Sequence, residues 1–146
     1  MIFGTTIAPM MEGKNADEIL DVALTKGINT FDTARGYERA EESLGSWMKR
    51  RGNRDQIVII SKCGNCDSDG SVCVNRKVIE TELAESLQAL QTDYIDIYLL
   101  HRDDPKTPVS EMIDTLNELQ KAGKIKVFGV STVSYTHLTL PTKLEV

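Results

Sequence analysis

Four side chains that can donate or stabilise a proton follow strand-like runs of the sequence. Asp32 ends a β-prone run, and Tyr37 comes five residues later, after a turn. Two later apolar runs lead directly into Lys62 and His101. The carboxyl ends of neighbouring parallel strands meet at one edge of a sheet. We therefore expect all four side chains to share that edge, with Tyr37 above the other three.

A phenol, an ammonium, a carboxylate and an imidazole together suit a site that donates a proton. The ordinary pKa of a tyrosine, about 10, is too high for efficient acid catalysis near neutral pH, and a nearby ammonium lowers it. Lys62 would have this effect on Tyr37, and Asp32 would hold Lys62 by a charge-assisted hydrogen bond. His101 would orient or polarise the substrate oxygen. Taken singly, each residue suits an ordinary structural role, but their convergence favours a function.

Strand-like and helix-like patterns alternate along the chain. The predicted strands are residues 2–7, 28–32, 56–61, 94–100 and 125–130. Residues 10–14 are predicted to be a connection, and the helical stripes between strands give four βα units plus a fifth strand. Such units form an open doubly wound sheet or part of a barrel. The chain has 146 residues and a complete barrel needs about 250, so we expect an α/β fold that is an incomplete (β/α)8 TIM barrel.

Polar residues and glycines mark the predicted ends of the helices. Asn15 opens a capping-box pattern, and Asn75 is placed to cap a later helix. Thr107 is predicted to cap the last helix. Gly27 and Gly123 follow helical stripes at the position where glycine ends a helix.

The composition is that of one ordinary globular domain, with 40% hydrophobic and 27% charged residues. The net charge is -5 and the pI is near 5.1, with basic residues scattered among acidic ones. This pattern argues against binding to nucleic acid or to an anionic membrane. No apolar run approaches the roughly 18 residues of a spanning helix, and the start lacks a secretory pattern. We expect a cytoplasmic protein.

Three cysteines, Cys63, Cys66 and Cys73, are crowded between the third predicted strand and the next helix. The first two have the C-x-x-C spacing of a redox or metal pair. A structural zinc site needs four ligands, however, and neither histidine is nearby in the sequence. We therefore expect reduced thiols and no metal site.

The last stretch, residues 133–146, departs from the alternating pattern. It is rich in threonine, contains Pro141 and has no helical apolar stripe. We expect the barrel part of the chain to cover residues 1–132. Residues 133–146 would form a tail that is disordered or is a translated cloning artefact. His137, in this tail, is given no role.

At the strand ends the sequence resembles the aldo-keto reductase family. The matching segments are residues 27–34 with Tyr37, 59–62, 97–105 and 124–131, in the family's order and spacing. The resemblance covers about residues 3–131. It implies the N-terminal part of a (β/α)8 barrel that binds NADPH in extended form and reduces an aldehyde or ketone to an alcohol.

The resemblance also implies a role for each of the four residues. Tyr37 would be the general acid that protonates the substrate oxygen. Lys62 and Asp32 would tune Tyr37, and His101 would orient the carbonyl group.

The resemblance assigns a partial cofactor site as well. Gly4, Thr5 and Asp32 would line the nicotinamide side of the pocket, and Ser131 would contact the carboxamide. Thr132 stands where the family usually has an asparagine that also holds the carboxamide. The family's later strands, which bind the rest of NADPH, have no counterpart here, so we expect impaired activity. The substrate and the choice between NADPH and NADH stay undetermined.

Two other functions remain open at this point. The chain could be a non-catalytic barrel fragment that acts as a binding or regulatory module. It could also be an open βα sheet that binds a small molecule at its carboxyl edge, which a stable monomer would favour. Half a barrel leaves two strand edges unpaired, so we expect self-association through them.

Overall fold

A computed structural model describes residues 1–65, 71–102 and 104–132. The strands form one parallel sheet in the order β1-β2-β3-β4-β5. Their bounds are β1 Ile2–Gly4, β2 Thr30–Asp32, β3 Val58–Cys63, β4 Ile95–Leu100 and β5 Ile125–Val130. Spatial order follows sequence order throughout, whereas a doubly wound sheet reverses its order at a switch point. The fold is therefore an incomplete (β/α)8 barrel, as predicted.

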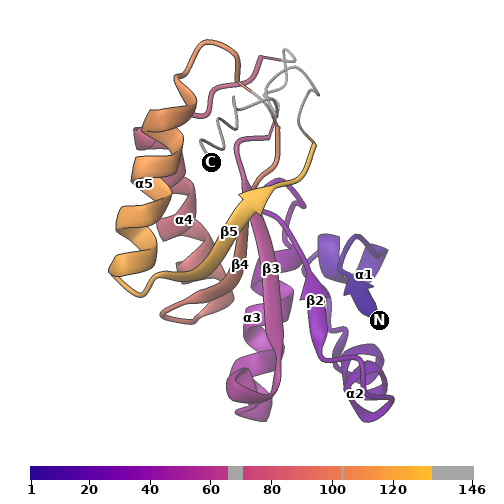
Figure 1. Ribbon diagram of the computed structural model, residues 1–146. Coiled ribbons are helices and arrows are strands. Elements are labelled where there is room, and N and C mark those ends of the chain that lie inside the picture. The colour runs from indigo at the N-terminus through magenta and orange to yellow at the C-terminus, as the bar shows by residue number, and fades with distance from the viewer. Residues whose placement is uncertain (66–70, 103, 133–146) are drawn as a thin grey trace.

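Helices connect the strands and cover one face of the sheet. They are α1 Ala8–Met11, α2 Asp17–Thr25, α3 Ala40–Arg51, α4 Arg76–Leu90 and α5 Val109–Lys121, with a 3₁₀ turn, η1, at Arg54–Gln56. Figure 1 shows α3 and α4 behind β3 and β4, with α5 beside α4. Within the described residues, no helix is both long and apolar enough to cross a membrane.

All five predicted strands are present, but β1 ends at Gly4 and not at Ile7, and Gln56 lies in the 3₁₀ turn before β3. Three further local expectations are corrected. β3 continues to Cys63, so Lys62 lies within the strand and not beyond it. Helix α1, at Ala8–Met11, overlaps the start of the segment 10–14 expected to be a connection, and its four residues are too few to show helical periodicity. The cap predicted at Thr107 is wrong, because Pro108 takes the N-cap position and the Thr107 hydroxyl donates to Asp104 Oδ2 at 2.9 Å.

Two asparagines are predicted to cap helices, and only one of them occupies the N-cap position. Asn75 is the N-cap of α4, and its Oδ1 accepts from the Val78 amide at 3.0 Å. Asn15 Oδ1 accepts from the Asp17 amide at 2.8 Å, but Ala16 is the N-cap of α2. The cap predicted at Asn15 therefore lies one residue outside the helix.

The hydrophobic core lies between the sheet and the helices. Phe31 and Trp47 are fully buried, with ring centroids 5.4 Å apart. The Trp47 indole donates to Asp21 Oδ1 at 2.8 Å, which ties α3 to α2. Gly45 in α3 has no room for a side chain, because a Cβ there would lie 2.3 Å from the carbonyl oxygen of Ala89. The backbones of α3 and α4 therefore pack in direct contact.

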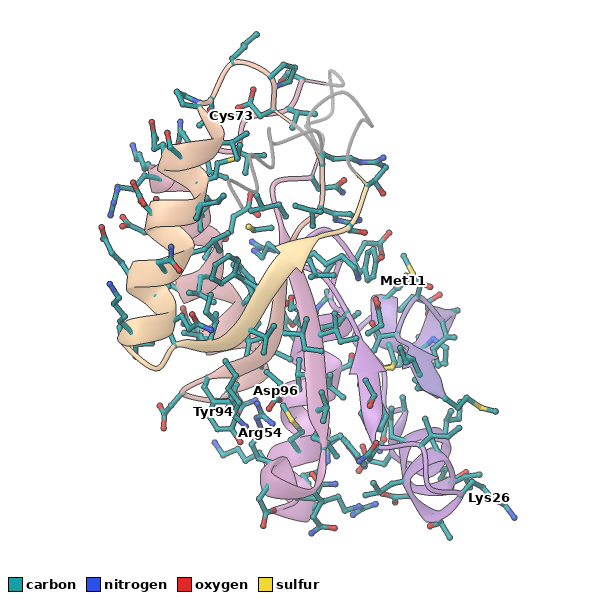
Figure 2. The ribbon with its side chains drawn as sticks, in the orientation of Figure 1. Met11, Lys26, Arg54, Cys73, Tyr94 and Asp96 are labelled. Carbon is teal, nitrogen blue, oxygen red and sulfur yellow. The ribbon has the colours of Figure 1, made fainter. Side chains whose placement is uncertain are left out.

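A polar cluster closes the end of the sheet opposite the carboxyl ends of the strands. Figure 2 shows Arg54, Tyr94 and Asp96 together there. The Asp96 carboxylate accepts from the Ile59 amide at 3.0 Å, from Arg54 at 2.8 Å and from Lys126 at 2.8 Å. Burial acts to raise the pKa of Asp96, but these hydrogen bonds outweigh it and hold the pKa below its ordinary value.

We expect Asp96→Asn to lower the free energy of unfolding by about 2–3 kcal/mol at pH 7, because it removes a buried charge from two cations. The lowered pKa of Asp96 stabilises the fold above the carboxyl's ordinary pKa of 3.8, and this contribution is lost as the pH falls through the folded-state pKa. The difference in the free energy of unfolding between wild type and Asp96→Asn should therefore become smaller in acid. Urea unfolding of both proteins at pH 7 and in acid measures this difference.

Asp93→Asn is the matched control, because Asp93 is exposed and lies three residues away. It should leave the unfolding free energy within about 0.5 kcal/mol of wild type. Equal stabilities for Asp96→Asn and Asp93→Asn would contradict a structural role for the cluster.

Candidate active site

The side chain of Lys62 is the centre of the predicted site. It is only 6% exposed, and its ammonium is bonded to the Asp32 carboxylate. The same Nζ donates to the carbonyl oxygen of Thr33 at 2.9 Å and to the Tyr37 hydroxyl at 3.4 Å. An ammonium has three N–H donors, so these three acceptors satisfy it completely. A buried cation is tolerated here because it is fully paired.

Tyr37 and His101 complete the group. Their ring centroids lie 5.8 Å apart with the planes at 80°, an edge-to-face contact. Lys62 Nζ lies 4.9 Å from the centre of the Tyr37 ring. The structure thus brings together all four side chains that the sequence placed at one sheet edge.

Backbone hydrogen bonds carry the chain from β2 to Tyr37. The amides of Thr33 and Arg35 donate to the carbonyls of Ile60 (2.8 Å) and Lys62 (3.1 Å), so the chain follows β3 past the end of β2. Gly36 then turns it against Asn65. A Cβ at Gly36 would lie 2.5 Å from the Asn65 side-chain nitrogen, so a larger residue there would require the Asn65 side chain to move.

The turn that presents Tyr37 is strained at its next residue. Glu38 has a φ of 48°, in the left-handed region, although it is not a glycine. This conformation costs about 1–2 kcal/mol. Such strain persists where surrounding contacts fix the backbone, and it is concentrated at functional sites.

His101 lies at the carboxyl end of β4. Its amide donates to the carbonyl oxygen of Cys63 at 2.7 Å, which sets it beside β3. Burial lowers the pKa of the imidazole, and the positive charges of Lys62 and Arg102 lower it further. His101 is therefore neutral at pH 7. Its Nδ1 is buried and has no hydrogen-bond partner in the part of the chain that the structure describes.

The residues predicted to hold the nicotinamide surround the same edge. Gly4 pairs in register with Asp32, and a Cβ on Gly4 would meet open space. The Thr5 amide donates to the Asp32 carbonyl at 3.0 Å, while its hydroxyl is buried without a partner among the described residues. Open space and an unused hydroxyl fit a planar polar ligand. The groups on this side of the site thus suit a nicotinamide.

The other side of the edge is formed where the chain leaves β5. The amide of Ser131 donates to the Leu100 carbonyl at 2.9 Å, and that of Thr132 donates to the His101 carbonyl at 3.3 Å. Both side chains are exposed. Ser131 is thus held beside His101 by the backbone, with its side chain free to meet a ligand.

Sequence reasoning missed the carboxylate that organises the loop after His101. Asp104 is 3% exposed and accepts from the amides of Val74 at 2.9 Å and Lys106 at 3.0 Å. These bonds, with that from Thr107, hold the pKa of Asp104 below its ordinary value. The signal was present, since an aspartate with a threonine three residues later is typical of a side-chain-bonded turn.

Two of the three cysteines lie in the described part of the chain. Cys63 is buried, and burial raises the pKa of its thiol to about 12, so it stays protonated. Cys73 is exposed. Cys66 lies outside the described residues. Among the described residues, no group of three or more His, Cys, Asp or Glu could hold a metal ion.

Comparisons with known proteins identify relatives of the chain. The family model described as the Aldo/keto reductase family matches residues 1–141. The aldo-keto reductase YhdN of Bacillus subtilis is 37% identical over 135 residues, covering 90% of this chain and 41% of the relative. Norsolorinic acid reductase B of Dothistroma septosporum is 36% identical, covering 81% and 33%. The probable aryl-alcohol dehydrogenase AAD4 of Saccharomyces cerevisiae is 37% identical, covering 83% and 40%.

A solved structure agrees with these sequence relatives. The aldo-keto reductase AKR11C1 from Bacillus halodurans, in its holo form, superposes with a TM-score of 0.78 at 33% identity. The match covers 90% of this chain and 45% of that protein. The chain therefore spans less than half of the length of the relatives that it matches. From its sequence, its fold and the arrangement of its strand ends, this chain belongs to the aldo/keto reductase family.

Proposed function

We propose that this site reduces an aldehyde or ketone to an alcohol, with Tyr37 as the proton donor and NADPH as the source of hydride. One observation carries the proposal: Lys62 Nζ contacts both the Asp32 carboxylate and the Tyr37 hydroxyl, with His101 against the Tyr37 ring. The nicotinamide supplies a hydride when it is bound. NADPH, as distinct from NADH, is taken from the family resemblance.

In this mechanism the substrate carbonyl lies between Tyr37 and His101. The neutral imidazole of His101 orients the carbonyl oxygen. As the carbonyl carbon accepts the hydride, the Tyr37 hydroxyl transfers its proton to that oxygen. The product is an alcohol, and the phenolate left on Tyr37 is stabilised by the Lys62 ammonium. Asp32 keeps that ammonium in place.

Four residues would hold the nicotinamide beside this group: Gly4, Thr5, Asp32 and Ser131. The open space at Gly4 leaves room for the ring, and the exposed Ser131 can bond to it, while Thr5 follows Gly4 with its hydroxyl buried and unpartnered among the described residues. Thr132 stands in place of the family's usual asparagine. It would therefore meet the nicotinamide carboxamide with a hydroxyl group instead of an asparagine side-chain amide. The names of two relatives, a norsolorinic acid reductase and a probable aryl-alcohol dehydrogenase, support substrates of the carbonyl and alcohol class.

We also propose a division of the chain and a location for it. Residues 1–132 form the reductase part, which works in the cytoplasm, and residues 133–146 do not belong to it. The family match extends to residue 141, so the boundary at 132 is itself open to test.

A binding role for a non-catalytic fragment is the second candidate. It is favoured by the apolar side chains left exposed on the outermost strands, Ile2 on β1 and Val127 and Val130 on β5. Unpaired strand edges bind other strands readily. The occupant that we propose is a second copy of this chain.

We expect Tyr37→Phe to lower kcat for NADPH-dependent reduction of an aromatic aldehyde by at least about 100-fold, because the variant has no proton to donate. The loss of NADPH fluorescence measures the rate. Tyr94→Phe is the matched control, since Tyr94 lies at the opposite end of the sheet. A folded wild-type chain that neither binds nor oxidises NADPH would contradict catalysis by this chain.

The lowered pKa of His101 gives a second expectation. Its imidazole should titrate below the ordinary value of 6.5, and kcat/KM should fall as acid protonates it. Because the folded chain binds this proton less readily than the unfolded chain, folding stability also falls as the pH drops below about 6.5. NMR titration measures the imidazole, and a His137→Gln variant assigns the two histidine signals. A His101 pKa at or above 6.5 would contradict this expectation.

Self-association provides a third test. We expect the chain to sediment as a dimer or larger species, and Val127→Lys to shift it towards the monomer, because a charge on an edge strand opposes pairing. Ile113→Lys, on the exposed side of α5, is the control and should leave the distribution unchanged. A wild-type chain that is monomeric at every concentration would instead favour an open sheet that binds a small ligand.

A further inference from the structure

A buried pair of polar side chains lies behind the site, on the helix-covered face of the sheet. Ser61 Oγ donates to Glu41 Oε1 at 2.6 Å. Ser61 is fully buried and Glu41 is 3% exposed. Neither residue belongs to the group around Lys62. The pair joins the first turn of α3 to the middle of β3.

The sequence places this pair directly beside the two residues that must meet for proton transfer. Ser61 precedes Lys62 on β3, and Glu41 follows Tyr37 by four residues. The Ala40 amide donates to the Tyr37 carbonyl at 2.9 Å, so the start of α3 is bonded directly to the Tyr37 turn. A contact between Glu41 and Ser61 therefore fixes the segment that carries Tyr37 against the strand that carries Lys62.

Other contacts also hold α3: near its start, the Ser43 hydroxyl donates to the carbonyl oxygen of Met10 at 2.8 Å. Gly45, one turn beyond Glu41, packs against the backbone of α4 with no room for a Cβ. The strained φ of Glu38 shows that the Tyr37 turn is held in place by its surroundings and not by its own preference. Among these surroundings, the Glu41–Ser61 bond is a buried side-chain hydrogen bond that links the helix start directly to β3.

Burying the carboxyl group of Glu41 has a desolvation cost that an apolar side chain of similar size would not have. Burial raises the pKa of Glu41, and the Ser61 hydroxyl opposes that rise only in part. Apolar residues of similar size commonly stabilise a fold at least as well as a buried polar pair. The pair thus suits a role that depends on direction as well as on packing.

We propose that Glu41 and Ser61 are positioning residues that set the separation between the Tyr37 hydroxyl and the Lys62 ammonium. The inference deepens the proposed function and rests on it for its catalytic meaning. The geometric claim, however, can be tested without any turnover.

The geometric test is NMR of the 146-residue chain with labelled tyrosine and histidine rings, in which Tyr37→Phe assigns the Tyr37 signal. We expect Glu41→Ala and Ser61→Ala to shift that signal and to weaken its cross-relaxation with the His101 ring. Glu41→Gln keeps an acceptor for Ser61 and should retain the wild-type pattern. Glu42→Gln is the matched control, because Glu42 is the exposed neighbour of Glu41.

The catalytic test is a steady-state comparison of the same variants. Glu41→Ala and Ser61→Ala should lower kcat by about tenfold and leave KM within about twofold, since misplaced groups lose rate more than binding. Circular dichroism checks that each variant is folded. If Glu41→Ala fails to fold, the ring signals and kcat of Ser61→Ala, which removes a single oxygen, test the positioning role.

The outcomes separate the two proposals. A wild-type chain that does not oxidise NADPH contradicts the proposed function, while the ring signals still report on Glu41 and Ser61. Folded Glu41→Ala and Ser61→Ala chains with wild-type Tyr37 signals would overturn the positioning role and leave the pair purely structural.

Discussion

The buried ammonium of Lys62 is the constraint on which the rest of the sheet edge depends. Removing a cation from water is costly unless each of its donors finds an acceptor. Here the three acceptors come from Asp32 at the end of β2, from the backbone of Thr33 and from Tyr37 on the following turn. One charge therefore fixes the relative positions of three chain segments. The same arrangement puts a phenol beside a cation, which a proton donor requires.

The proposed site and the main stabilising contacts occupy different parts of the sheet. The proposed site lies at the carboxyl ends of the strands, whereas the Asp96 cluster closes the opposite end, as is usual in (β/α)8 barrels. Across the sheet, the helix-covered face holds the apolar core and the Glu41–Ser61 pair. The proposed support for the Tyr37 turn thus lies behind the strand, while the residues of the proposed site lie at its carboxyl end.

The same connectivity explains both the presence of the site and the exposure of the strand edges. The relatives extend well beyond the segment that matches this chain, which spans 41% of one relative and 45% of a solved structure. The first five strands already bring together all four proposed proton-transfer residues. The outermost strands keep apolar side chains such as Val127 exposed, at 55%. The residues of the proposed site therefore all lie within the segment that matches this chain.

The sequence alone determined the five strands, their parallel arrangement and the four residues at their ends. This was possible because buried parallel strands leave continuous apolar runs, and because their carboxyl ends must share one edge. The tertiary structure alone decided that the Thr33 carbonyl completes the bonding of Lys62, that Thr107 bonds Asp104 instead of capping α5, and that Glu41 reaches Ser61. Those contacts join residues that are distant in the sequence, or they depend on which of several groups bonds to a given partner. Local patterns record propensity, whereas the choice between partners depends on packing in three dimensions.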